Sequence, residues 1–236
     1  MELFIKLLLA HILGDFIFQT SGLVKRKEKH KLASPHLYLH VAIHGVLTLL
    51  LLLHEHSNYW YIAIIIAVTH LIIDALKLYF TTKKNRTTLF FLDQLAHITV
   101  LVVITLIVYP DLTLDDNIIN TVLALLLCTI FLTAPVSIML KTFFMRWENH
   151  IEDSGVNSLK NAGKWIGMLE RLFVFVFIIT NHWEAVGFLL TAKSVFRFGD
   201  LSKAKNMKLT EYVLIGTLLS FGIAILTGLF FNIAIS

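Results

Sequence analysis

Histidine and aspartate side chains occur in pairs four residues apart inside four strongly apolar stretches of this 236-residue sequence. Each ionisable side chain at the centre of a membrane helix costs about 2.5–3.5 kcal/mol on insertion scales, so its presence there predicts a function. On a helix, residues four apart lie on one face, where two side chains can bind one metal ion or each other. The pairs are His11 and Asp15, His40 and His44, His70 and Asp74, and Asp93 and His97.

These five imidazoles and three carboxylates provide enough nitrogen and oxygen donors for one or two divalent cations. Zinc, manganese or ferrous iron suits such a mixed set. Thiolate clusters are excluded because Cys128 is the single cysteine. The predicted metal ligands are His11, Asp15, His40, His44, His70, Asp74, Asp93 and His97. A bound ion would acidify a water molecule, and one of the carboxylates Asp15, Asp74 or Asp93 would accept its proton.

The same pairs have two simpler interpretations. They could hydrogen-bond between helices and only hold a bundle together, or they could form a proton relay. Helix packing is the better explanation for any one pair. Four pairs at one depth in the membrane favour metal binding instead.

The composition is that of a membrane protein. Hydrophobic residues make up 57% of the chain and charged residues 15%, with a mean hydropathy of +0.77, and apolar runs of about 20 residues recur along it. We therefore predict an all-α fold, a polytopic bundle of about eight transmembrane helices in a single domain over residues 1–236. The predicted helices are residues 3–20, 36–54, 59–79, 88–109, 118–140, 165–181, 183–198 and 210–233.

Loop charges predict the orientation of these helices. Basic residues fall in alternate loops, at 25–31, 83–86, 141–164 and 203–208, whereas the loops at 54–58, 111–117 and 181–183 contain no lysine or arginine. The positive-inside rule then predicts that both termini lie outside the cytoplasm. It also predicts that all four His and Asp pairs lie in the cytoplasmic half of the membrane. Because the basic residues are confined to short loops, we expect no nucleic-acid partner.

A second group of charges lies at a similar predicted depth in residues 111–236. An arginine and lysine cluster beside a divalent cation could hold a phosphate or carboxylate group. The alternative is that these side chains only snorkel to the membrane surface and set the topology, above all Lys193 and Arg197. The predicted substrate-binding residues are Glu170, Arg171, Lys193 and Arg197.

Residues 1–110 also carry a hint of duplication. A shift of 59 residues aligns His11 and Asp15 with His70 and Asp74. A shift of 57 residues aligns His36 and His40 with Asp93 and His97. This would be a parallel repeat of two helices, with the site at the repeat interface.

Three segments together resemble a known family: His-Ile-Leu-Gly-Asp-Phe-Ile-Phe-Gln at 11–19, His-Leu-Ile-Ile-Asp at 70–74 and Asp-Gln-Leu-Ala-His at 93–97. The family is the bacterial membrane family called domain of unknown function 3307, and the resemblance covers about the first 110 residues. It implies no reaction. More distantly, the His-x-x-x-Asp pairs look like those of bacterial inner-membrane proteins described as metal-dependent hydrolases, an analogy that carries no substrate with it.

The function we expect is a metal-dependent hydrolase in a bacterial cytoplasmic membrane, with its site open to the cytoplasm or inner leaflet. The substrate would be an anionic lipid, a nucleotide-like molecule or another phosphate-bearing amphiphile. The alternative is a transporter or sensor of a metal ion or anion that uses the same residues, although the outer halves of the helices offer little polar route. The third possible function is a non-catalytic scaffold, in which the polar pairs only fix helix packing.

Overall fold

The computed structural model describes residues 2–53, 59–110, 118–145, 162–201 and 207–235, and the regular elements in these ranges are all helices. The predicted loops at 54–58 and 111–117, and most of those at 142–164 and 203–208, lie outside the described residues. The chain forms two compact units, Met1–Leu127 and Cys128–Ser236. The boundary between the units falls within helix α6.

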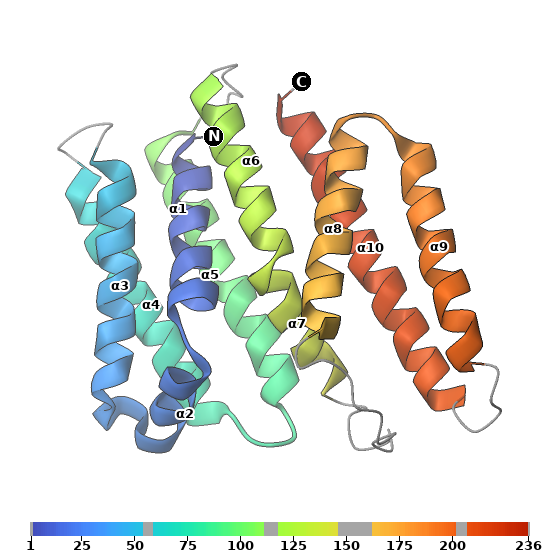
Figure 1. Ribbon diagram of the computed structural model, residues 1–236. Coiled ribbons are helices and arrows are strands. Elements are labelled where there is room, and N and C mark those ends of the chain that lie inside the picture. Colours follow the sequence, from blue (N-terminus) through green and yellow to red (C-terminus); the bar gives the residue numbers. More distant parts are fainter. Residues whose placement is uncertain (1, 54–58, 111–117, 146–161, 202–206, 236) are drawn as a thin grey trace. The chain divides into compact units, whose positions relative to one another are not determined.

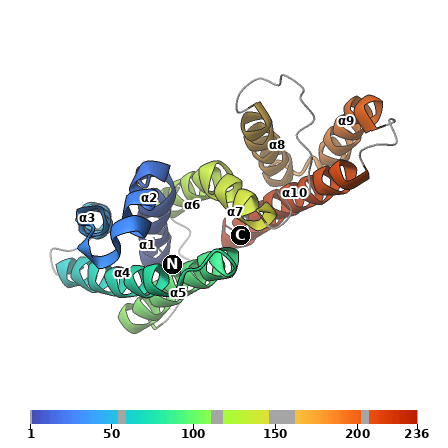
Figure 2. The ribbon, with the colours of Figure 1, turned by 90° about the horizontal axis from the view of Figure 1, so that it is seen from below.

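The long helices of the first unit run side by side in Figure 1, and the short polar helix α2 lies at their lower end. Seen from below in Figure 2, α3 is viewed nearly end-on, and it packs against both α1 and α4. The elements are α1 (Glu2–Ile12), the π-helical turn η1 (Leu13–Phe18), α2 (Ser21–His30), the 3-10 turn η2 (Lys31–Ala33), α3 (Pro35–Leu52), α4 (Trp60–Phe80), α5 (Arg86–Val108) and the start of α6 (Ile118–Leu132).

Each long helix of this unit buries one stripe of residues, apolar at one end and polar at the other. In α4, for example, Ile62 and Ile66 are buried, followed one and two turns later by His70 and Asp74. The apolar ends form a core of Leu3, Leu7, Leu52, Ile62, Ile66, Leu101 and Ile104. Because neighbouring helices alternate in direction, their polar ends meet at the other end of the unit.

Helix α2 corrects one sequence prediction. Residues 25–31 were expected to be a loop, because they are too polar to span a membrane, but Ser21–His30 is helical. Its lysine, arginine and glutamate residues are good helix formers, and Thr20 caps its first turn by accepting a hydrogen bond from Leu23 N at 3.5 Å. The chain bends by 89° between Glu2–Phe18 and Ser21–Ala33.

The second unit contains the end of α6 and the helices α7 (Ala134–Phe144), α8 (Ala162–Ile179), α9 (Trp183–Leu201) and α10 (Met207–Ile235). The helix predicted over 118–140 is broken at Thr133, between α6 and α7. Pro135 explains the break, because it lacks an amide donor and its ring clashes with the carbonyl one turn earlier. Helix α8 packs against α10 and also against α9.

Among the described residues, five helices are long and apolar enough to cross a membrane, or six if the bent pair at the N-terminal end counts as one span. The all-α class is thus confirmed for the described residues, which also contain several helices able to span a membrane. The helices counted are Pro35–Leu52, Trp60–Phe80, Arg86–Val108, Ile118–Phe144 and Thr210–Ile235, with the bent pair beginning at Glu2.

Candidate metal centre

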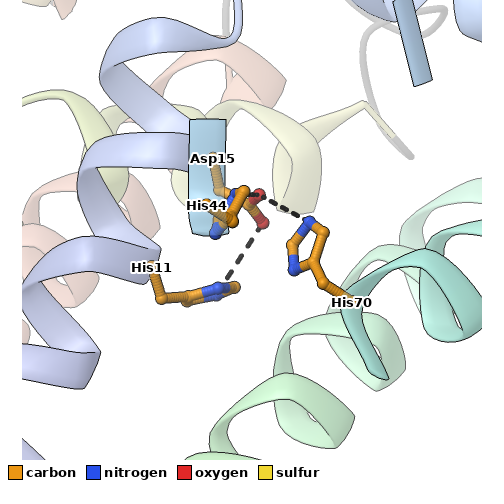
Figure 3. A group of neighbouring side chains, drawn as sticks. All are labelled: His11, Asp15, His44 and His70. Carbon is orange, nitrogen blue, oxygen red and sulfur yellow. Dashed lines mark hydrogen bonds and ion pairs between the residues drawn. The ribbon is translucent and has the colours of Figure 1, made fainter. Parts of the chain in front are cut away.

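The carboxylate of Asp15, in η1, lies at the centre of the polar end of the first unit. Figure 3 shows the rings of His11, His44 and His70 gathered around it, from α1, α3 and α4. Its Oδ1 atom lies 3.1 Å from His44 Nε2 and 3.6 Å from His70 Nε2, and its Oδ2 atom lies 3.7 Å from His11 Nε2. His40 Nε2 is a further neighbour, 3.1 Å from Oδ1. All four imidazoles are buried.

These contacts are more numerous than hydrogen bonds alone can use. A ring nitrogen offers either one proton or one lone pair, and therefore makes one good hydrogen bond. His40 Nε2, however, lies 3.0 Å from Gln19 Nε2, 3.0 Å from His70 Nε2 and 3.1 Å from Asp15 Oδ1. The chemistry that uses several such lone pairs at once is coordination of a cation.

Two local features bring Asp15 close to α3. The π-helical turn widens the helix at Leu13–Phe18, and such turns occur frequently at functional sites. Gly14 then allows the close approach, because a Cβ atom there would overlap the ring of His44, with Cδ2 only 2.8 Å away. The glycine is therefore required by the histidine that it faces.

The other two carboxylates each form a salt bridge with a lysine. Lys27 Nζ, from α2, donates to Asp74 Oδ2 at 2.6 Å, and both groups are buried. Lys77 Nζ donates to Asp93 Oδ2, also at 2.6 Å. Asp15 has no lysine partner among its described contacts and is surrounded by imidazoles and an amide.

Gln94 connects two of the carboxylates. Its Nε2 atom donates to Asp15 Oδ2 at 2.8 Å and to Asp93 Oδ2 at 3.2 Å, and its Oε1 atom lies 3.3 Å from His11 Nε2. On the far side, Asp93 Oδ1 and His97 Nε2 are buried without a hydrogen-bond partner and lie 3.6 Å apart. An unsatisfied buried pair of this kind needs a bound ion or water.

Three sets of donor atoms lie within 4.8 Å of one another and could hold a metal ion. The first set offers three nitrogens and one oxygen, so a five-coordinate ion held there would keep one position for water or substrate. The second includes Asp74, and the third includes Asp93, so both contain a lysine-paired carboxylate. The sets are His11, Asp15, His44 and His70; His40, His70 and Asp74; and Asp15, Asp93 and His97. The structure thus brings together all eight residues predicted as metal ligands.

The charged residues predicted in the second half lie in the second unit. Lys193 Nζ donates to Glu170 Oε2 at 2.5 Å, between α9 and α8. Arg171 donates to Leu132 O at 2.6 Å and Thr133 O at 3.3 Å, and to two serine hydroxyls. The side chain of Arg197 lies outside the described residues. The role predicted for these four residues in binding an anion stays a prediction.

Sequence reasoning missed Lys27, Lys77 and Gln94 as parts of this site. Lys27 is one of several basic residues in a run, and nothing in the sequence separates it from its neighbours. Gln94 and Lys77 carried a signal, since each is a polar residue in an apolar helix within one turn of a paired residue, His97 and Asp74 respectively.

The sequence of the first unit matches a known family. The family model described as Protein of unknown function (DUF3307) matches residues 3–126, which is more than half of the chain. The chain belongs to this family. The DUF3307 match ends at nearly the same residue as the first unit, Leu127, and includes every residue of the metal-capable sets. Neither the curated proteins nor the solved structures contain a match to the chain.

Proposed function

We propose that the first unit binds one divalent cation and uses it for hydrolysis of an anionic substrate. The observation that carries the proposal is the convergence of three imidazole nitrogens, of His11, His44 and His70, within 3.7 Å of the carboxylate oxygens of Asp15. Buried imidazoles and a carboxylate at such spacing are the donor set of zinc, manganese or ferrous iron sites in proteins.

The first donor set, His11, Asp15, His44 and His70, is the one we assign to the ion. Its carboxylate is not neutralised by lysine, whereas Asp74 and Asp93 are. Charge supports a single ion as long as both lysines stay paired with their carboxylates. With neutral imidazoles, the three carboxylates and two lysines carry a formal charge of −1, so one divalent cation leaves +1. A hydroxide ion or one oxygen of an anionic substrate would then bring this low-dielectric site close to neutrality.

Hydrolysis needs a group that accepts a proton from the attacking water. Asp93 Oδ1 and His97 Nε2 support this role, because they lack partners and share a donor set with Asp15. Lys77 and Gln94 hold the other oxygen of Asp93 and so fix its orientation. Lys27 does the same for Asp74. The ion would polarise the scissile group, and the lysines would add positive charge near the substrate.

The membrane setting completes the proposal. We place the chain in a bacterial cytoplasmic membrane as eight helices, with both termini outside the cytoplasm and the polar end of the first unit facing it. The exposed basic residues Lys25, Lys29, Lys83 and Lys84 support this orientation, because they lie on α2 and the α4–α5 turn, the elements at that end. The substrate would then be an anionic lipid or a nucleotide-like molecule reached from the inner leaflet or the cytoplasm.

Transport of a metal ion or anion is the second function that the same residues could serve. It needs a polar route to the opposite face, and that end of the first unit is filled by the apolar core of Leu3, Leu7, Leu52, Ile62, Ile66, Leu101 and Ile104. This core favours the hydrolase over the transporter.

Metal content is the test of this proposal. We expect purified wild-type protein in detergent to carry about one zinc, manganese or iron ion per chain by elemental analysis, and His70→Ala to lose it. His182→Ala is the matched control, because His182 is exposed and lies in the second unit. With the ion identified, release of phosphate from anionic lipids and nucleotides would be measured in the loaded protein. Wild-type protein without metal, even after reloading, contradicts the proposal.

A further inference from the structure

Lys27 is the one buried residue of α2, a helix whose other residues are exposed or partly exposed. Lysine is among the residue types least often buried, and it is buried almost only when paired. Its partner is Asp74, 47 positions later in the sequence, at 2.6 Å. The side chain therefore inserts from a surface helix into the polar end of the first unit.

The other contacts that hold α2 are weaker. Glu28 and Arg86 form a salt bridge whose side chains are 36% and 46% exposed, and exposed pairs of this kind contribute little and are screened by salt. Arg26 contacts His36 at the surface. The 89° bend before α2 gives the segment a natural hinge at residues 19–20. Among the described side-chain contacts of α2, the salt bridge of Lys27 with Asp74 is thus the buried one.

The carboxylate that Lys27 occupies belongs to the second donor set, with His40 and His70. His40 Nε2 lies 3.8 Å from Asp74 Oδ2 and 3.0 Å from His70 Nε2, so two imidazole nitrogens face the same carboxylate. The Lys27 ammonium donates to the carboxylate, and the described contacts include no hydrogen bond from it to either ring, whereas a metal ion would bind the carboxylate and a ring nitrogen together. In this structure the positive charge beside these donor atoms is the ammonium group of Lys27.

We propose that His40 and Asp74, the members of this set that the first ion leaves free, form a second, weaker divalent-cation site that competes with Lys27, so that occupation of the site releases α2 and opens the polar end of the unit. The inference rests on the proposed function, because it assumes that a first ion occupies the set around Asp15. The ion and the Lys27 ammonium compete for the single negative charge of Asp74, and two cations side by side at this buried carboxylate repel each other. Occupation of the second site therefore uncouples α2 from α4.

The position of α2 can be measured with two spin labels in protein reconstituted in nanodiscs. The labels are placed at Lys29→Cys on α2 and Lys83→Cys in the α4–α5 turn, both exposed, with Cys128→Ser removing the native thiol. Zinc is the added ion because it is diamagnetic and leaves the interspin distances readable. Bound zinc per chain is counted on the same samples.

We expect a single interspin distance at one zinc per chain, and a shift to longer, broader distances as a second zinc binds. Lys27→Met should give the longer distances at one zinc per chain and should bind the second ion more tightly by roughly 5- to 150-fold, the usual range of coupling between two binding equilibria. Lys27→Arg, which keeps the charge, should resemble the wild type. Lys25→Met, an exposed lysine on the same helix, is the matched control.

Unchanged distances in Lys27→Met overturn the inference. So does a wild-type protein that binds one zinc and no second, and this result leaves the proposed function standing. A wild-type protein that binds no zinc overturns both. If Lys27→Met is not monodisperse, Asp74→Asn replaces it, since it removes the carboxylate that Lys27 and the second ion share. Asp74→Asn should then bind one zinc, with α2 released.

Discussion

Asp15 is the residue on which the proposed centre depends. Lysine side chains neutralise the other two carboxylates, whereas Asp15 contacts four imidazoles and the amide of Gln94. An uncompensated carboxylate among neutral rings is costly at membrane depth unless a cation accompanies it. The three aspartates are therefore not equivalent in the structure, although each lies four residues from a histidine in the sequence.

Replacing Asp15 by Asn should separate the two kinds of carboxylate. Asp15→Asn keeps the shape of the side chain but removes its charge, so we expect the affinity for the first ion to fall by more than about 100-fold, beyond the 10- to 100-fold typical of outer-shell partners. Asp74→Asn is the matched control and should keep that ion. Zinc titration with a competing chelator measures both. Equal losses in the two variants would show that the ion is not held by the Asp15 set.

Gly14 offers a test of the geometry without removing a donor atom. A Cβ atom at this position would overlap the ring of His44. We expect Gly14→Ala to displace the ring and weaken the first metal site, with a loss of stability of about 1–3 kcal/mol, as for other overpacked sites. Gly45→Ala on α3 is the control, because its added Cβ would meet Ala67 Cβ at an ordinary 3.6 Å.

Metal affinity and thermal unfolding in detergent would measure the effect. A Gly14→Ala protein that unfolds at the wild-type temperature and keeps its ion would show that η1 adjusts freely. The close approach of Asp15 to α3 would then not be required for the site.

Residue types and spacing were sufficient to predict which His and Asp residues come together, and insufficient to predict how each is compensated. The pairs at i and i+4 share a helix face by backbone geometry alone, and loop charges gave them a common depth. The lysine partners depend on tertiary packing. Lys27 reaches Asp74 only because α2 folds back under the bundle, and no local pattern encodes that contact.

At the scale of the elements, hydropathy located the long helices to within a few residues. The predicted 36–54 and 59–79, for instance, are Pro35–Leu52 and Trp60–Phe80. Hydropathy did not reveal changes of helix type or breaks in a helix where the residues on both sides are equally apolar. The π-helical turn at Leu13–Phe18 and the break at Thr133 both lie inside apolar runs. Helix α2 is too polar to register as a span at all.

Arg171 supports the break between α6 and α7. Its guanidinium donates to Leu132 O at 2.6 Å, whereas Thr133 O also accepts from the amide and the hydroxyl of Ser137. We expect Arg171→Met to lower the stability of the second unit by about 1–3 kcal/mol, because Leu132 O would be left without this donor. Lys164→Met, an exposed position on the same helix, is the matched control.

Thermal unfolding in detergent measures this difference. If Arg171→Met were as stable as the wild type, the bond from the guanidinium to Leu132 O would not be needed for the fold. The guanidinium would then be available for the anion-binding role predicted from the sequence.

At the scale of the whole molecule, some of the eight proposed spans are recognised by their apolar composition, whereas others carry charged residues that must be paired before the helix can enter a membrane. Neither α8 nor α9 is among the candidate membrane spans. They carry Glu170, Arg171 and Lys193, whose pairing within the second unit lowers the cost of placing them in a membrane. Our proposal of eight spans requires that both of these helices cross.

The position of the α8–α9 turn tests that requirement. With eight spans and both termini outside, His182 lies outside the cytoplasm and Thr82, in the α4–α5 turn, lies inside it. Both residues are exposed. In a Cys128→Ser background, we expect a membrane-impermeant maleimide to label His182→Cys in intact cells, and Thr82→Cys only after permeabilisation. If α8 and α9 did not cross, His182→Cys would also need permeabilisation, and the topology would reduce to the six spans that composition supports. Labelling of Thr82→Cys in intact cells would instead reverse the orientation, and the polar end of the first unit would face away from the cytoplasm.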